Sequence, residues 1–481
     1  MSIPFYKQYI DGTKVILPNS VTKIDDYAFS GCNSLTSVEI PGSVREIGNG
    51  AFWDCTGLTS IEIPDGVTKI GHDAFANCYR LVSFEIPNSI KEIDSGAFRG
   101  CAGLTSIHIP ESIKEISARA FQGCTGLTSI KIPNGVTVIR AGAFEGCTGL
   151  TSIVIPSSVT KIESGIFDGC TGLTSVEIPS SIKEIEILAF AGCSGLTSVD
   201  IPSSVAAIRA GAFDGCTGLV SIEIPDSVTK IQNDTFYGCT SLATIEIPSS
   251  VTKIGCKAFR GCKGLKRIEI PNGVTVIGEE AFRDCTGLKS IEIPNSVKVI
   301  REGAFWGCKG FSSIEIPNGV MEIEDDTFRG CKGLISIEIP DSVMKIGDGA
   351  FFGCNRLASI EIPNGVTEIG EDTFSSCNGL KSIKIPDDVT KIGKRAFRNC
   401  TCLTSIVIPN SVMEIGEGAF NGCTGLNELR INAKHPRRME RLLKYELDSQ
   451  AQITLYVPNG TEDAYRRNRF FSKFKEILAQ M

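Results

Sequence analysis

The 481-residue sequence has few of the residues from which catalytic and metal sites are usually built. It contains three histidines, His72, His108 and His435, and each stands apart from the other two. Isolated histidines are more often solvated surface residues than acids, bases or metal ligands. The serines lie in turns and strands without a G-x-S-x-G motif, and no Walker-type phosphate loop is present. The sequence therefore predicts a protein that is not an enzyme and has no cofactor.

Long apolar runs are also missing. A proline or a polar turn interrupts every apolar segment well before the roughly 18 residues that a membrane-spanning helix needs. The first residues, MSIPFYKQYIDGTK, contain no basic region followed by an apolar one, so no secretory signal is visible. We expect no membrane insertion, and a cytoplasmic location is one alternative for this chain.

The net charge of −7 is unevenly distributed. Residues 432–481 carry ten Lys and Arg against six Asp and Glu, a net charge of +4, so the rest of the chain carries −11. An acidic body does not attract phosphate backbones, and nucleic acid is not an expected partner. A content of 42% hydrophobic and 21% charged residues is typical of a folded chain with a buried core.

The sequence is rich in one pattern that recurs every 23 residues. Eighteen prolines from Pro18 to Pro409, eighteen cysteines from Cys32 to Cys423 and eighteen phenylalanines from Phe29 to Phe420 keep this step. A fixed period of this length indicates a solenoid, in which each repeat buries its apolar face only by stacking on its neighbours.

The repeat from Leu58 to Cys78 shows what each part of the period does. In an extended segment Ile61 and Ile63 point to one side and Glu62 to the other. Pro64 removes a hydrogen-bond donor and ends this strand in a turn. A second apolar segment follows, and an Ala-Phe pair then has the spacing of a single helical turn. Stacked coils of this kind predict an α/β repeat solenoid with a continuous parallel β-sheet and short helical turns.

The repeat L-x-x-I-x-I-P-x-x-V-x-x-I-x-x-x-A-F-x-x-C resembles the BspA-like class of leucine-rich repeats, and LTSIEIPDGVTKIGHDAFANC from Leu58 is one example. The resemblance covers about residues 13–431, and the segment from Ile453 resembles the closing segment of many bacterial members. The pattern lacks the asparagine ladder of ordinary leucine-rich repeats. The resemblance implies a right-handed coil of about eighteen units, and a surface or secreted protein that binds host proteins, partner cells or other macromolecules.

The ends of the array are predicted to be caps, because an uncovered terminal coil would expose apolar surface and a strand edge. The expected divisions are an N-terminal cap segment at 1–12, the solenoid at 13–431, and a C-terminal cap at 432–481. The C-terminal cap is predicted to contain a helix, a strand and a final helix, with Thr461 as the N-cap of the last helix.

The twenty cysteines indicate packing rather than cross-linking. Eighteen of them occur once per repeat, whereas disulfide frameworks use irregular spacings to tie distant loops together. Side chains that point in parallel suit packing better than bridging, so we predict free, buried thiols. Cys256 and Cys402 lie outside the register, and Cys402 is the expected reactive one of the two. Without a C-x-x-C motif or clustered histidines, no zinc site is expected.

Acidic residues recur between the last two isoleucines of the strand, where the side chain should face solvent. Stacked carboxylates repel one another by roughly 1 kcal/mol per pair in water. A row that tolerates this repulsion predicts a binding surface for a basic partner, although duplication of a tolerated residue, or more weakly a calcium site, would also explain it. The predicted surface, called here the acidic track, consists of Glu177, Asp200, Glu223, Glu246, Glu269, Glu292, Glu315, Glu338 and Glu361.

A second candidate row directly follows the ladder phenylalanines. Aromatic and arginine side chains are enriched at interface anchors, and they can also stack on one another as cation–π pairs in a purely structural arrangement. Nearby acids could neutralise these arginines as well. This aromatic/basic row consists of Tyr237, Arg260, Arg283, Trp306, Arg329 and Phe352.

The sequence thus predicts a non-enzymatic binding scaffold, in adhesion or protein–protein interaction at a bacterial surface. The expected partner is a protein with basic character, such as a host or cell-surface protein, and the span 237–361 is its preferred location because both rows overlap there. Two alternatives remain open. A carbohydrate-binding surface protein would use Trp306 and Phe352 as sugar platforms, and an intracellular interaction scaffold would fit the lack of a visible signal.

Overall fold

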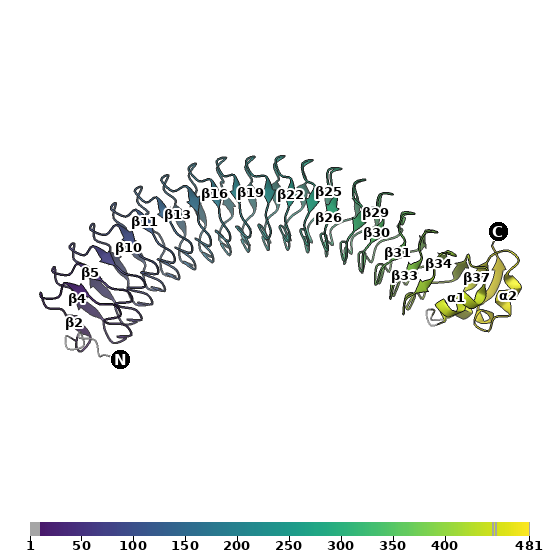
Figure 1. Cartoon of the computed structure of the whole chain (residues 1–481), viewed down its shortest axis with the longest axis horizontal. Coiled ribbons are helices and arrows are strands. Elements are labelled where there is room, and N and C mark those ends of the chain that lie inside the picture. Colours follow the sequence, from purple (N-terminus) through teal and green to yellow (C-terminus); the bar gives the residue numbers. More distant parts are fainter. Residues whose placement is uncertain (1–9, 445–446, 448–449, 481) are drawn as a thin grey trace. The chain divides into compact units, whose positions relative to one another are not determined.

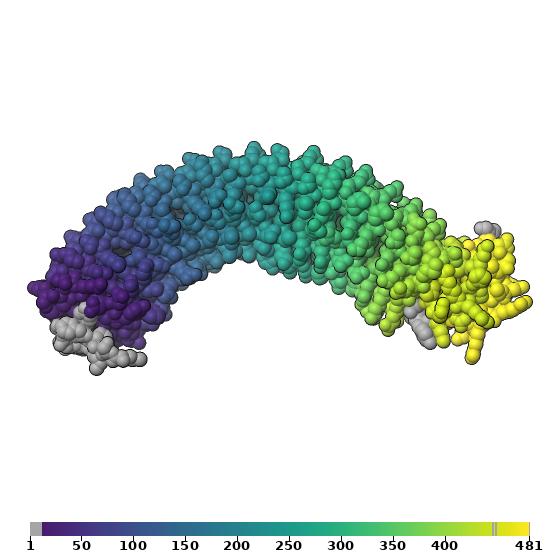
Figure 2. Space-filling view, in the orientation of Figure 1, coloured from purple at the N-terminus to yellow at the C-terminus, as the bar shows by residue number. Residues whose placement is uncertain are grey.

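The computed structural model describes residues 10–444, 447 and 450–480 (Figure 1). The chain divides into two compact units, Met1–Pro248 and Ser249–Met481, which we call the N-terminal and C-terminal units. Both are built from the same 23-residue repeat, so the same local rules apply in each. The space-filling view shows closely packed side chains over the visible face of each unit (Figure 2).

Each repeat contains two short strands joined by turns. In the repeat from Leu58 the longer strand is Ser60–Glu62 (β6), in which Ile61 is buried between two exposed residues. Pro64 ends this strand, and its carbonyl accepts a hydrogen bond from the N–H of Val67 in a tight turn. The shorter strand is Lys69–Ile70 (β7), with the isoleucine buried and the lysine exposed. The alternation that the sequence predicts is confirmed.

In the N-terminal unit the longer strands are β2 (Lys14–Ile16), β4 (Ser37–Glu39), β6, β8 (Ser83–Glu85), β10 (Ser106–His108), β13 (Ser152–Val154), β15 (Ser175–Glu177), β17 (Ser198–Val199), β19 (Ser221–Glu223) and β21 (Thr244–Glu246). The shorter strands are β3 (Lys23–Ile24), β5 (Glu46–Ile47), β7, β9 (Glu92–Ile93), β11 (Glu115–Ile116), β12 (Val138–Ile139), β14 (Lys161–Ile162), β16 (Glu184–Ile185), β18 (Ala207–Ile208) and β20 (Lys230–Ile231).

In the C-terminal unit the longer strands are β23 (Arg267–Glu269), β25 (Ser290–Glu292), β27 (Ser313–Glu315), β29 (Ser336–Glu338), β32 (Ser382–Lys384), β34 (Ser405–Ile408) and β36 (Glu428–Ile431). The shorter strands are β22 (Lys253–Ile254), β24 (Val276–Ile277), β26 (Val299–Ile300), β28 (Glu322–Ile323), β30 (Lys345–Ile346), β31 (Glu368–Ile369), β33 (Lys391–Ile392) and β35 (Glu414–Ile415).

Equivalent strands of successive repeats pair in parallel and in register. Glu39 lies opposite Glu62 in the pairing of β4 with β6, and Ile47 lies opposite Ile70 in the pairing of β5 with β7. The parallel solenoid is therefore confirmed. The sheet of longer strands is interrupted rather than continuous. Most of these strands pair over only three residues, and the proline that follows each strand has no N–H to extend the pairing. The shorter strands form a second set of parallel ladders.

Phenylalanine and cysteine ladders fill the core of each unit. The rings of Phe52 and Phe75 stack with centroids 5.2 Å apart and planes 5° apart. Most ladder thiols donate a hydrogen bond to the backbone carbonyl of a ladder phenylalanine in the preceding repeat, as from Cys78 Sγ to the oxygen of Phe52 at 3.2 Å. All twenty cysteines are free. The predicted free, buried thiols are confirmed along the ladder except at its first member, Cys32, which is half-buried.

The segment around each ladder phenylalanine forms turns, and the predicted helical turns are wrong. In the repeat from Leu58, Asp73 and Asn77 adopt positive φ angles of 52° and 62°. The N–H of Phe75 bonds to the carbonyl of Ala97 in the next repeat, whereas its neighbours bond three residues back within the turn. A helix needs every N–H to bond four residues back, so alternating bonds between coils replace it.

The N-terminal cap contains one described strand, β1 (Ile10–Asp11), which pairs antiparallel with β2. Residues 1–9 of the predicted cap segment lie outside the described residues. The antiparallel pairing covers the edge of β2 that would otherwise be open.

The C-terminal cap extends the long-strand sheet with two more parallel strands, β37 (Thr454–Val457) and β38 (Glu476–Ala479). Around them lie α1 (Pro436–Leu443), η2 (Gln450–Gln452), α2 (Glu462–Arg466) and η3 (Phe471–Lys473). In the described ranges no helix is long and apolar enough to cross a bilayer.

The predicted final helix of the cap is wrong after Arg466. The side-chain oxygen of Asn468 accepts hydrogen bonds from the N–H groups of Phe470 and Phe471, which ends the helical path. The last residues then form β38, which pairs with β37 and takes the place of the expected helix. Thr461 occupies the N-cap position, but its hydroxyl donates to the carbonyl of Pro458 instead of accepting from the helix.

Candidate binding surface

The acidic track lies on the exposed side of the longer strands in both units. All nine of its side chains are exposed. Glu223 lies opposite Glu246 in the N-terminal unit, and Glu269 lies opposite Glu292 in the C-terminal unit. Equivalent strands are roughly 4.8 Å apart. Within the described part of the chain, none of the nine carboxylates forms an ion pair, so their mutual repulsion is relieved only by solvent.

In the C-terminal unit part of the acidic track lines a shallow surface groove of ≈ 790 Å³. Glu269, Glu292 and Glu315 stand along it, and the turns after their strands form its other wall with Pro271 and Pro294. The prolines hold these turns at the same height in successive repeats, because each fixes its own φ angle. The groove is therefore open, elongated along the stack and acidic.

The shorter strands carry charges of both signs that pair with one another. Lys161 contacts Glu186 at 3.0 Å in the N-terminal unit, and in the C-terminal unit Lys391 contacts Glu368 at 2.6 Å. Hydrogen bonding to Lys23 holds the pKa of Glu46 below its ordinary value. Charges on this side neutralise one another, which sets it apart from the side of the longer strands.

The aromatic/basic row is half-buried and internally paired in the C-terminal unit. The guanidinium of Arg283 lies 3.6 Å from the ring centroid of Trp306, and that of Arg329 lies 4.2 Å from the ring of Phe352. Arg260 and Arg283 both contact the carboxylate of Glu280. Cation–π stacking and neutralisation by acids are the contacts expected if the row has a purely structural role. Its role as a binding surface stays a prediction.

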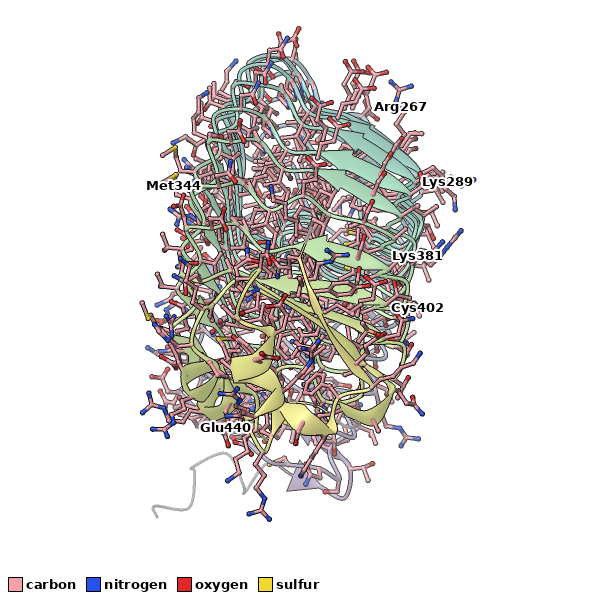
Figure 3. The ribbon with its side chains drawn as sticks, turned by 90° about the vertical axis from the view of Figure 1, so that its right-hand side faces the viewer. Arg267, Lys289, Met344, Lys381, Cys402 and Glu440 are labelled. Carbon is pink, nitrogen blue, oxygen red and sulfur yellow. The ribbon has the colours of Figure 1, made fainter. Side chains whose placement is uncertain are left out.

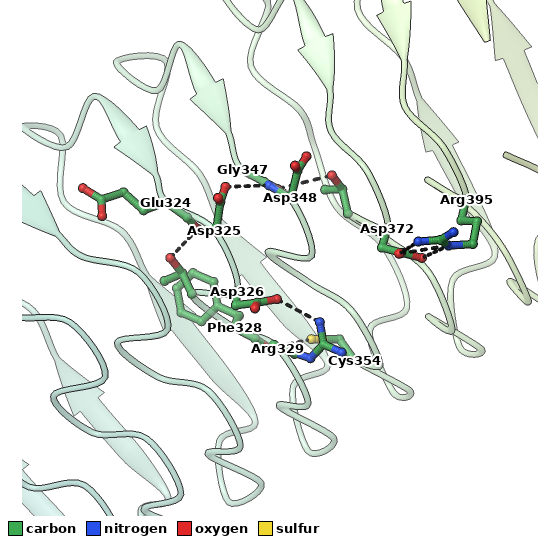
Figure 4. A network of polar contacts seen from close by, with 12 residues as sticks. Glu324, Asp325, Asp326, Phe328, Arg329, Gly347, Asp348, Cys354, Asp372 and Arg395 are labelled. Atoms are coloured by element: carbon green, nitrogen blue, oxygen red, sulfur yellow. Dashed lines mark hydrogen bonds and ion pairs between the residues drawn. The ribbon is translucent and has the colours of Figure 1, made fainter. Parts of the chain in front are cut away.

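Acids in the turns near this row hold the backbone together (Figure 4). The carboxylate of Asp325 accepts a hydrogen bond from the N–H of Asp348 at 2.8 Å, and the carboxylate of Asp348 accepts one from the N–H of Glu371 at 2.6 Å. Arg329 donates to Asp326 at 3.0 Å. The carboxylates of Asp325 and Asp348 each satisfy a backbone donor of the next coil, and that of Asp326 pairs within its own repeat, so these acids are structural.

Sequence reasoning missed a group of cations at the start of the longer strands in the C-terminal unit. Arg267 begins β23 two residues before Glu269, and Lys289 directly precedes β25. Figure 3 shows Arg267, Lys289 and Lys381 on the side of the longer strands and Met344 on the other side. Comparing successive repeats at the positions before the acidic track would have revealed this group.

A run of acids after the ladder phenylalanines of the N-terminal unit was missed as well. Glu145, Asp168 and Asp214 occupy this position and are half-buried. Burial, together with the charges of Asp234 and Asp168, raises the pKa of Asp214 to about 6. The pKa of Asp168 is also raised, by burial and by Glu145.

Replacing Asp214 with asparagine is expected to stabilise the protein at pH 7 by about 1 kcal/mol, after allowance for partial solvent screening. Its pKa is about 6 in the folded chain and about 4 in an unfolded one. The penalty is therefore absent below pH 4, grows as the pH rises from 4 to 6, and is complete above pH 6. Urea unfolding between pH 4 and 8 measures it.

The matched control is Asp226→Asn, which removes an exposed turn carboxylate one repeat farther along. This variant should leave the pH dependence of stability between pH 4 and 6 unchanged. Equal responses of the two variants would contradict the assignment of the penalty to the half-buried Asp214.

Among the residues that the structure describes, no group of three or more His, Cys, Asp or Glu side chains is placed to hold a metal ion. His72 lies at the surface with its Nδ1 3.3 Å from a carboxylate oxygen of Asp94. Cys402 is exposed and Cys256 is half-buried.

Comparison with known proteins places the repeats in one family. Residues 4–128, 114–243, 229–355 and 321–439 match the family described as "BspA type Leucine rich repeat region (6 copies)". No curated protein matches the chain.

Several solved structures are similar to this chain. A leucine-rich repeat protein from Bacteroides ovatus is 28% identical over 92% of this chain and 91% of its own, with a TM-score of 0.47. A leucine rich cell surface protein from Faecalibacterium prausnitzii is 27% identical over 89% of this chain and 90% of its own, with a TM-score of 0.30. A leucine-rich repeat protein from Eubacterium ventriosum is 23% identical over 73% of this chain and 85% of its own, with a TM-score of 0.40.

Proposed function

The chain belongs to the family of BspA-type leucine-rich repeats, and we propose that it is a non-enzymatic scaffold for adhesion or protein–protein interaction at a bacterial surface. Repeat arrays of this kind present long, regular faces on which a partner can be held. Membership in the family supports the surface location. Fractionation of native cells tests it, and recovery of the protein in the cytosol alone would support the intracellular scaffold instead.

The observation that carries the proposal is the unpaired state of the acidic track beside the groove. Glu269, Glu292 and Glu315 are exposed in successive repeats, and none of them has an ion-pair partner in the described ranges. The acids of the shorter strands, such as Glu322 and Glu368, are paired with lysines. A basic partner in the groove would relieve a repulsion of roughly 1 kcal/mol per neighbouring pair, so the partner we propose is a protein with a basic stripe.

The carbohydrate-binding alternative finds less support. A sugar platform needs an open aromatic face, but the guanidinium of Arg283 lies 3.6 Å from the ring centroid of Trp306. Arg329 lies between Trp306 and Phe352, at 5.1 Å from the first ring and 4.2 Å from the second. Both aromatic side chains are thus engaged by neighbours.

Reversing two charges of the acidic track is expected to weaken binding to a basic partner at least tenfold. The double variant Glu292→Lys and Glu315→Lys removes two attractions of roughly 1 kcal/mol and adds two repulsions of similar size, before screening by salt. The measurement is solid-phase binding to a panel of extracellular matrix proteins and to a synthetic peptide of alternating lysine and serine, at low and at high salt.

The matched control reverses Glu62 and Glu85, which occupy the same strand position in the N-terminal unit outside the acidic track. Its change in net charge is the same, so it should lose much less binding. Equal losses in the two variants would show a response to net charge alone. Undiminished binding by the Glu292→Lys and Glu315→Lys variant would show that the acidic track is not the binding surface.

A further inference from the structure

The C-terminal unit carries a strip of cations at the beginning of its longer strands. Its members come from four successive repeats, at the position after the ladder cysteine and at the two positions that open the strand. All of them are exposed. The basic strip consists of Lys263, Lys266, Arg267, Lys289, Lys309 and Lys332.

The N-terminal unit has no charge at the same three positions after its first, partial repeat, whose strand β2 begins with Lys14. In its repeats from Cys32 to Pro248 these positions are occupied by Thr, Ser, Asn, Ala, Val or Tyr. The repeat therefore folds without cations there, and the basic strip is not required by the solenoid. Residue types that break a repeated pattern at exposed positions point to a function outside the fold.

The cations of the basic strip have no acidic partners in residues 10–444, 447 and 450–480. Elsewhere in the C-terminal unit lysines of the shorter strands pair with carboxylates, as Lys345 does with Glu322 and Lys391 with Glu368. Arg267 lies on the same face of β23 as Glu269, which follows it by two residues. An unpaired row of exposed cations creates a local positive potential in an otherwise acidic chain.

The direction of the basic strip restricts the shape of its ligand. Lys266 and Lys289 occupy the same position in successive repeats, as do Lys309 and Lys332, and the members of each pair are roughly 4.8 Å apart along the stacking direction. The positive charge therefore extends in a line along the stack. The acidic track runs beside it at the far end of the same strands. A thin linear polyanion can follow the line without contacting Glu269 and Glu292, whereas a broad acidic protein surface would cover those carboxylates and be repelled by them.

We propose that the basic strip binds a linear sulfated polysaccharide. Lysine ammonium groups bind such anions as point charges and do not need the two-point hydrogen-bond geometry of an arginine guanidinium. Basic clusters of this size are typical of heparin-binding surfaces. Single-stranded nucleic acid fits less well, because its bases stack on exposed aromatic rings and the basic strip includes none. This ligand is additional to the protein partner of the acidic track, and the two sites lie side by side in one unit.

The test is binding of the full chain to heparin, the probe, measured by affinity chromatography and by titration at fixed salt. The variant Lys266→Thr, Arg267→Ser, Lys289→Thr introduces the residues that the N-terminal unit carries at these positions. We expect it to bind heparin at least tenfold more weakly and to elute at lower salt. A circular dichroism spectrum equal to that of the wild type confirms that it is folded.

The control variant Lys183→Thr, Lys253→Thr, Lys384→Ser removes three exposed cations outside the basic strip, and its heparin binding should change less than twofold. Equal losses in the two variants would overturn the proposal, as would equal binding of heparin from which the sulfate groups have been removed. A single-stranded oligonucleotide that binds as tightly as heparin, and is lost with the same variant, would overturn it in favour of nucleic acid.

The same variants separate this inference from the protein-binding proposal. The variant of the basic strip should keep or increase its affinity for the lysine–serine peptide, because the acidic track remains and nearby positive charges are gone. The Glu292→Lys and Glu315→Lys variant should bind heparin at least as tightly as the wild type. Loss of heparin binding in that variant would contradict a separate polyanion site.

Discussion

Replacement of Phe305 by alanine is expected to lower the local free energy of unfolding by about 3–5 kcal/mol. The ring is fully buried and stacks between those of Phe282 and Phe328, with a centroid distance of 5.6 Å to each. The backbone cannot close the cavity that the substitution leaves. The N–H of Phe305 bonds to the carbonyl of Thr327 in the next repeat, and bonds of this kind keep the coils at a fixed spacing.

The effect should stay close to the substituted repeat. In a solenoid each repeat contacts only its neighbours, so stability is close to a sum of local terms and unfolding is not strictly two-state. Hydrogen exchange measured by mass spectrometry resolves this. Exchange of amides between Phe282 and Phe328 should accelerate by roughly two to four orders of magnitude, whereas amides in repeats around Phe98 should keep their wild-type rates.

The control is Phe311→Leu, which changes another fully buried ring at the start of the next repeat. Other repeats have leucine at this position, Leu288 and Leu334 among them, and Phe311 contacts Phe305 by its edge at 5.9 Å. The cost should be below about 1.5 kcal/mol, because leucine fills most of the same volume. An equal loss of protection in the two variants would contradict a special role of the stacked ladder.

The solenoid could be predicted because its physics repeats with its sequence. Eighteen copies of one pattern leave little choice of register, since a shift by one residue would expose Ile61 and bury Glu62 in every copy. Features that depend on a single residue or on contacts between coils were not predictable in the same way. Asn468 ends a helix through two side-chain hydrogen bonds, and the turns around Phe75 depend on bonds to the following coil. Neither can be seen in one stretch of sequence.

The candidate surfaces were predicted unevenly for a related reason. The acidic track follows directly from strand alternation, so its exposure could be inferred, while its role remains a prediction. The stacking of Arg283 on Trp306 depends on the distance between coils and on side-chain direction. The raised pKa of Asp214 depends on burial and on two carboxylates from other repeats. The basic strip could have been found in the sequence, but only by comparing equivalent positions of successive repeats and noting where lysine or arginine replaces the usual residue.

In the native protein Cys402 is expected to react with Ellman's reagent far faster than the ladder cysteines. Cys402 is exposed, whereas Cys331 and Cys377 are fully buried and each donates its S–H to a backbone carbonyl at 3.1 Å. Burial raises the pKa of each of these two thiols to about 12. Only the thiolate attacks a disulfide reagent, so their reactivity is suppressed both by access and by ionisation.

The size of the difference follows from the pKa values. At pH 8 a thiol of pKa about 12 is ionised to roughly one part in ten thousand, against roughly a quarter for an ordinary exposed thiol. The native protein should therefore show one rapid equivalent, slower reaction of the half-buried Cys32 and Cys256, and twenty equivalents after unfolding. The thiols in the core should become available only at the rate at which repeats open.

Cys402→Ser is the matched control. It should remove the rapid equivalent without changing the slower reaction of Cys32 and Cys256 or the stability of the fold. Rapid modification of more than three thiols in the native protein would show that the repeats open readily and that burial does not protect the ladder. A count below twenty after unfolding without reductant would instead reveal disulfides. Because the buried ladder thiols donate their S–H to the preceding coil, oxidation of any of these buried thiols requires its coil to separate from the preceding one. The opening of the solenoid and the oxidation of its buried cysteines should therefore have the same rate.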